Sequence, residues 1–175
     1  TPPAAPAHPP VPQPLDTAAM DPRVELMWDT YGVPHVFAED PSALFYAFGW
    51  AQMDSHADLL LRLYAQARGR AAEYWGPAFI ESDTWVRTNG IPARAATWVT
   101  QQRPHIGAYL DAFVLGINAY AQRHPEAIGE AYRQVLPITA ADVLAHQQRV
   151  LNYTFVANPA IATVAQRQLQ GGSNA

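Results

Sequence analysis

The chain has 175 residues, a formal net charge of −4 and an apolar content of 49%, which suits one globular domain with its own core. Its eleven basic residues are all arginine and are scattered, so the sequence lacks the clustered positive charge of a nucleic-acid-binding protein. The absence of cysteine excludes disulfides, thiolate nucleophiles and cysteine-ligated metals. No apolar run approaches the roughly 20 residues of a membrane-spanning helix, so no membrane span is expected.

Proline dominates the N-terminal end, where it fills eight of the first 22 positions. Because proline lacks a backbone N–H and favours extended geometry, residues 1–22 are predicted to form a mobile tail. A ligand for a proline-recognition module is the alternative interpretation. Residues 23–175 are predicted to form a single helical domain without internal repeats. The chain starts at Thr1 rather than Met, which fits a mature end left by removal of an export signal, or an arbitrary boundary.

A hairpin is predicted directly after the tail. Apolar and polar residues alternate from Val24 to Trp28, which indicates a half-buried strand. Tyr31-Gly32 then supplies a turn before a return strand at residues 34–38. A two-stranded hairpin alone is marginal in water. We therefore expect it to extend a sheet that belongs to another chain.

The first predicted helix has clear start and stop signals. Asp40 and Pro41 are the residue types favoured at the N-cap and first position of a helix, which runs to about Ala67. Residues 68–70 interrupt the helical pattern, and Gly76-Pro77 ends the region. The apolar stripe of this helix consists of Leu44, Phe45, Phe48, Ala51, Leu59 and Leu63.

Two further helices are predicted in the second half of the chain. One begins near Pro104 and is stopped by Pro125. The other begins at Thr139, where residues 139–142 resemble a capping box with Asp142 in place of glutamate. The chain is thus expected to be mainly α with a short N-terminal β-hairpin.

No serine lies in a recognised nucleophile motif such as Gly-x-Ser-x-Gly. Ser42 is interpreted as a residue in the first turn of a helix. His35 is interpreted as a structural residue of the return strand rather than a catalytic base. These residues therefore provide no evidence for an independent active site in this chain.

Asp54, His56 and Asp58 place two carboxylates and an imidazole within about one helical turn. The two aspartates share a helix face, as paired metal ligands do. No further ligand stands at a recognised spacing, so we expect no metal or cofactor and favour a buried hydrogen bond or salt bridge for Asp54. Its favoured ionic partners are Arg62, Arg68 and Arg70. An independent metalloenzyme that uses the three residues is the alternative.

Three motifs follow one another between Asp29 and Gly76. They are Asp29-Thr30-Tyr31-Gly32-Val33-Pro34-His35-Val36, the apolar run at residues 44–54, and Ala67-Arg68-Gly69-Arg70-Ala71-Ala72-Glu73-Tyr74-Trp75-Gly76. In order and spacing they resemble the small (α) subunit of the penicillin acylase family of N-terminal nucleophile hydrolases. The resemblance extends from about Val24 to about Val156.

The resemblance implies an αββα sandwich that is completed by a large β subunit. That partner carries the nucleophile, a serine at its own N-terminus, so this chain contributes no catalytic residue and is active only with the partner. The family also favours a periplasmic or secreted location.

Ser173 lies in Gly171-Gly172-Ser173-Asn174-Ala175, which resembles the junction where this family cuts itself. At such a junction the freed α-amine, with a pKa of about 8, serves as the base. The nitrogen of Ser173 is an amide here, and a subunit cut at that bond would end at Gly172. We favour a flexible end at a trimming site, with the junction as the alternative.

In the family, the third helix supplies an arginine and an apolar residue that line the acyl pocket. The matching residues are Arg149 and Val150, and Leu151 follows them as a third substrate-binding candidate. Val150 resembles the aliphatic residue of acyl-homoserine lactone acylases, whereas penicillin G acylases carry phenylalanine there. The alternative is that Val150 is a core residue. Residues 152–156 contain no carboxylate, so the calcium of penicillin G acylases is not expected.

The resemblance therefore implies hydrolysis of N-acyl-homoserine lactones to a fatty acid and homoserine lactone through an acyl-enzyme. Deacylation of β-lactam antibiotics is a further expected activity of the same pocket. A penicillin or lipopeptide-antibiotic acylase subunit is the nearest alternative. A non-enzymatic helical binding subunit is the alternative from a different functional class.

Overall fold

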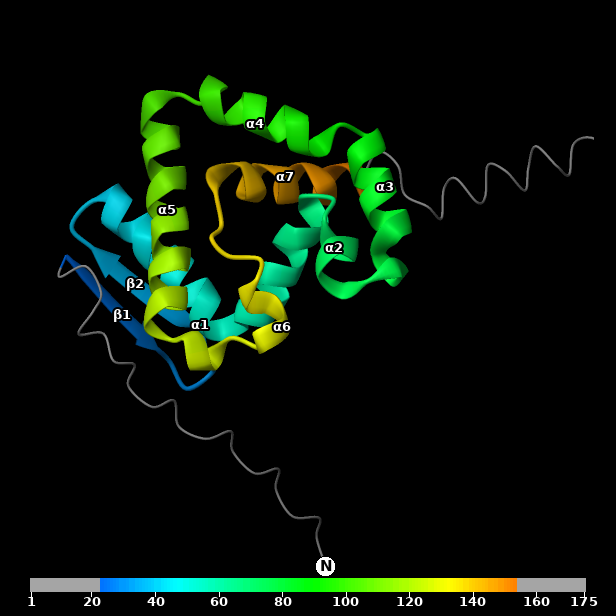
Figure 1. Ribbon diagram of the computed structural model, residues 1–175. Helices are drawn as coiled ribbons and strands as arrows, with labels where there is room; N and C mark the ends of the chain where they lie inside the picture. Colours follow the sequence, from blue (N-terminus) through cyan, green and yellow to red (C-terminus); the bar gives the residue numbers. More distant parts are fainter. Residues whose placement is uncertain (1–22, 154–175) are drawn as a thin grey trace, which may run out of the picture.

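The computed structural model describes residues 23–153, which are mainly helical with a two-stranded sheet at the N-terminal end (Figure 1). Strand β1 (Val24–Trp28) pairs antiparallel with β2 (Pro34–Ala38), which confirms the predicted hairpin. Leu26 on the inner face of the hairpin is buried against the helices. The predicted tail at residues 1–22 lies outside the described residues.

Helix α1 (Pro41–Ala67) is the long central helix. The Asp40 carboxylate accepts a hydrogen bond from the Ala43 N–H at 2.9 Å, and proline lies in the first turn, so the predicted start is confirmed. The helix ends where predicted, and Gly69 then turns the chain with a φ of 63°. The sequence did not reveal an interruption at His56, whose φ of −150° and ψ of 39° are not helical.

Short elements fill the region between the first two predicted helices, for which the sequence analysis assigns no helix. Asp83 fastens two of them together, because its carboxylate accepts hydrogen bonds from the N–H groups of Ala71 and Ala72 at 3.0 and 2.7 Å. The elements are α2 (Ala71–Trp75), the 3₁₀ helix η2 (Pro77–Phe79), α3 (Ile80–Thr88) and α4 (Ile91–Gln101).

The second half of the described chain confirms the other two predicted helices. Thr139 and Asp142 form the predicted capping box at the start of the last one. None of the helices in residues 23–153 has the length and apolar character of a membrane span. The elements are α5 (Pro104–Arg123), the 3₁₀ helix η3 (Pro125–Ala127), α6 (Glu130–Arg133) and α7 (Ala140–Leu151).

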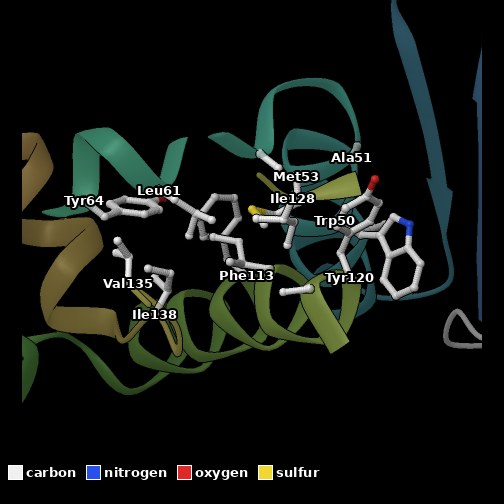
Figure 2. Close-up of a cluster of buried hydrophobic side chains, with 14 of the residues drawn as sticks. Trp50, Ala51, Met53, Leu61, Tyr64, Phe113, Tyr120, Ile128, Val135 and Ile138 are labelled. Atoms are coloured by element: carbon white, nitrogen blue, oxygen red, sulfur yellow. The ribbon is translucent and has the colours of Figure 1, made fainter. Parts of the chain in front are cut away.

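Helices α1 and α5 cross at close range because each carries a glycine at the crossing. A Cβ on Gly49 would overlap the carbonyl oxygen of Phe113, and a Cβ on Gly116 would overlap that of Tyr46. The main core fills the space beside this crossing (Figure 2). Its buried members include Trp50, Met53, Leu61, Tyr64, Phe113, Tyr120, Ile128, Val135 and Ile138.

A smaller apolar cluster fixes the position of α7. Figure 1 shows α4 lying along α7, and the two helices are in direct contact. Helix α7 also packs on α1, so it is held on two sides. The buried members of this cluster are Ala67, Val86, Ile91, Ala95 and Ala145.

The described chain buries only part of the predicted apolar stripe of α1, such as Ala51. An apolar stripe ordinarily faces the core, yet Leu44, Phe48 and Leu59 remain 41%, 43% and 55% exposed. Helix α5 packs instead on the neighbouring face of α1, where small residues and Gly49 allow close approach. That buried face includes Ala43, Ala47, Trp50, Met53, Ala57, Leu61 and Tyr64.

Candidate functional site

The three residues that suggested a metal site serve other purposes. Among residues 23–153, no group of three or more His, Cys, Asp or Glu side chains is placed to hold a metal ion. His56 lies at the interruption of α1. The Asp58 carboxylate accepts a hydrogen bond from the backbone N–H of Gly129 at 2.8 Å and so fastens the loop before α6. The metalloenzyme alternative therefore has no site in the described part of the chain.

Asp54 makes a half-buried hydrogen bond with the phenol of Tyr120, which confirms that part of the prediction. Burial raises the pKa of Asp54 above its usual value and raises the pKa of Tyr120 to about 12. Of the two predicted possibilities, a hydrogen bond or a salt bridge to an arginine, the described residues show the hydrogen bond. The partner is a tyrosine on α5, so this contact links the two central helices.

The first sequence motif builds the hairpin turn. One carboxylate oxygen of Asp29 accepts hydrogen bonds from the N–H groups of Tyr31 and Val33, both at 2.9 Å. Its other oxygen lies 3.3 Å from Nε2 of His35. The hydrogen bond from Val33 lowers the pKa of Asp29. His35 thus lies within a turn network, and Ser42 lies in the first turn of α1, as predicted.

Arg68, from the third motif, anchors the start of α7. Its Nε and Nη2 donate to the two carboxylate oxygens of Asp142 at 2.6 and 2.8 Å. Its Nη1 and Nη2 also donate to the carbonyl oxygens of Val135 and Pro137 at 2.6 and 2.9 Å. Because Asp142 also accepts the N–H of Thr139 at 2.7 Å, one carboxylate both caps α7 and ties it to the end of α1.

The other end of α7 carries the predicted substrate-binding residues. Val150 and Leu151 are 39% and 43% exposed, so Val150 is not part of the core formed by the described residues. The Arg149 guanidinium lies over the ring of Tyr153, with 5.9 Å between Cζ and the ring centroid. No carboxylate of residues 23–153 forms an ion pair with Arg149. This end of α7 therefore presents two aliphatic side chains beside a cation that lacks a described counter-charge.

Polar atoms without described partners gather in the same two turns of α7. They are His146 Nδ1, both amide atoms of Gln148 and Arg149 Nε. Burial lowers the pKa of both His146 and Arg149, and the positive charge of Arg149 lowers that of His146 further. These atoms have no hydrogen-bond partner among the described residues, which is unusual for buried polar groups.

The structure thus brings Arg149, Val150 and Leu151 together at one helix end. It adds Gln148 and Tyr153, which the sequence analysis missed. Gln148 is only 2% exposed, and Tyr153 is 48% exposed. Glutamine is ordinarily a surface residue, so nothing in the sequence marks this one as buried.

Comparison with known proteins shows which protein family this chain is similar to. Residues 23–174 match the family profile described as penicillin amidase. The chain is 25% identical over 109 residues to penicillin G acylase of Escherichia coli, an alignment that covers 61% of this chain and 13% of the relative. It is 25% identical over 129 residues to the acyl-homoserine lactone acylase QuiP of Pseudomonas aeruginosa, with 74% of this chain and 14% of the relative covered. The chain therefore spans less than a fifth of the length of either curated relative.

A solved structure shows the same fold. The thermostable penicillin G acylase from Alcaligenes faecalis superposes with a TM-score of 0.70 and 27% sequence identity. The superposition covers 86% of this chain and 84% of that chain. Together with the profile match over residues 23–174, this agreement extends from the hairpin through α7. The chain belongs to the penicillin amidase family.

Proposed function

We propose that this chain is the small subunit of a heterodimeric acylase that hydrolyses a linear amide through an acyl-enzyme. A large β subunit carries the nucleophilic serine at its N-terminus and supplies most of the sheet of an αββα sandwich. This chain matches 84% of one chain of a solved acylase but only 13% of the length of the E. coli acylase. That difference supports an enzyme made of two chains, of which this is the smaller.

The proposed substrate is an N-acyl-homoserine lactone, which is split into a fatty acid and homoserine lactone. The observation that carries this proposal is the exposed aliphatic surface of Val150 and Leu151 at the end of α7. Each methylene of an acyl chain that is buried against such a surface contributes about 0.8 kcal/mol to binding. Acyl-homoserine lactone acylases among the relatives support the same substrate class.

In this proposal Arg149 closes one side of the acyl pocket rather than taking part in bond cleavage. Its guanidinium lies over Tyr153, and its buried Nε has no hydrogen-bond partner among the described residues. Hydrolysis of a β-lactam side chain in the same pocket is the second candidate function. The likeness to two penicillin G acylases favours it.

Purification of the native protein with its accompanying chain tests the two-chain mechanism. We expect a larger chain whose N-terminal residue is serine, and amide hydrolysis by the complex. Replacement of that serine by alanine is expected to abolish hydrolysis while the complex still forms. Full activity of the alanine variant would contradict the proposed nucleophile.

A further inference from the structure

Helix α1 is apolar on two faces, and the described chain covers only one of them. Helix α5 covers the face that contains Trp50 and Leu61, both of which are 1% exposed or less. The second face keeps Phe48 and Leu59 at 43% and 55% exposure. A helix that is apolar around its circumference is normally enclosed by protein, so this second face lacks part of its cover.

The uncovered face of α1 forms one wall of a groove of about 400 Å³. The turn side of the hairpin forms the other wall through Gly32 and Pro34. Phe48 lines one end of the groove on α1, and Leu59 lines it eleven residues later. The two anchors lie on either side of the interruption at His56.

The lining of this groove is mainly apolar, with a few polar side chains among its residues. Gln52, Ser55 and His56 line it between the two apolar anchors. The backbone at His56 is not helical, so the regular hydrogen-bond pattern of α1 is broken there. A ligand that fits this surface therefore makes mainly apolar contacts, with room for hydrogen bonds to Gln52, Ser55 and His56.

We propose that this α1 groove seats an extended segment of the large acylase subunit, with one apolar side chain against Phe48 and another against Leu59. This inference rests on the proposed two-chain function and names the surface that the partner covers. The relatives support this occupant, because more than four fifths of their length lies outside the region that this chain matches. The hairpin wall supports it as well, since Tyr31 and Val33 in the hairpin turn remain 91% and 51% exposed.

The groove is a separate feature from the proposed acyl-binding surface at the end of α7. Figure 1 shows the hairpin and the C-terminal end of α7 at opposite sides of the molecule. Loss of contact at the groove should therefore weaken subunit association while leaving the substrate preference of the assembled enzyme unchanged. That separation allows the groove and the acyl pocket to be tested independently.

Photo-crosslinking in the co-expressed two-chain protein tests the proposal. A photoreactive p-benzoylphenylalanine replaces Leu59 in one variant and Leu115 in the control, because Leu115 is 61% exposed on α5 and does not line the groove. We expect a cross-link to the large subunit from position 59 and none from position 115. A cross-link from position 59 to a second copy of this chain, or equal cross-linking from both positions, would overturn the proposed surface.

Charge substitution gives a second, quantitative test. L59E should lower the amount of large subunit that co-purifies with this chain at least tenfold, whereas L115E should leave it as in the unchanged protein. Equal retention in L59E and the unchanged protein would overturn the docking surface alone. If the unchanged protein itself purifies without a large subunit, the two-chain function fails, and that result is distinct from failure of the groove.

Discussion

Arg68 and Asp142 form a two-pronged ion pair that joins the end of α1 to the first turn of α7, with N–O distances of 2.6 and 2.8 Å. Both side chains are largely buried, with exposures of 15% and 8%. The same α7 helix carries Arg149 and Val150 at its other end. The family motif around Arg68 therefore helps to position the proposed pocket, because it holds the first turn of α7 in place.

Asp142→Asn is expected to destabilise the protein by about 3 kcal/mol, because it leaves the buried charge of Arg68 unpaired. For a chain of this size, that corresponds to a fall of about 6–12 °C in the thermal midpoint. Glu73→Gln is the matched control, since Glu73 pairs with Arg70 while 54% exposed. It should cost less than about 1 kcal/mol. Equal midpoints for the two variants would contradict the anchoring role of Arg68.

Gly116→Ala is expected to cost about 3 kcal/mol or more, because the added Cβ would overlap the backbone carbonyl of Tyr46 and force α1 and α5 apart. Gly107→Ala on the same helix is the control. A Cβ at Gly107 has no neighbour within 4 Å, so this change should stabilise the helix by about 0.5–1 kcal/mol. Opposite shifts of the thermal midpoint are the expected result, and destabilisation by both changes would argue against a specific helix crossing.

His146 makes stability depend on pH. Its pKa in the folded chain is lowered by burial and by Arg149, so the unfolded chain binds a proton more readily. The stability contributed by neutral His146 is complete above its unfolded pKa of about 6.5 and is lost as the pH falls below that value. His146→Gln should therefore flatten the decline in thermal midpoint between pH 7 and pH 5. The exposed His105→Gln is the control, and an unchanged slope in the His146 variant would contradict this assignment.

The elements that the sequence predicts well are those with strong local signals. Asp40 and Pro41 mark the start of α1, and the Thr139–Asp142 box marks the start of α7. Helices α3 and α4 escaped prediction because neither begins with a capping side chain. Without such a start signal a short helix is hard to recognise from local sequence.

The orientation of α1 could not be read from its apolar pattern, because the helix is apolar on two faces. The sequence shows no preference between the face of Trp50 and the face of Phe48. Only the glycine-mediated approach of α5 selects the face with Trp50. Similarly, the resemblance indicated Arg149 and Val150, but the unpartnered buried Gln148 beside them depends on packing from α4 and α1, which local sequence does not encode.

The end of α7 is proposed to line a pocket for an aliphatic acyl chain. The most direct measurement compares kcat/KM for a long-chain N-acyl-homoserine lactone with that for benzylpenicillin, in the native complex and in its Val150→Phe variant. The account predicts that the native complex prefers the lactone and that Val150→Phe shifts the ratio toward benzylpenicillin by at least tenfold, or about 1.4 kcal/mol. A native preference for benzylpenicillin, or a ratio that does not change in the variant, would contradict it.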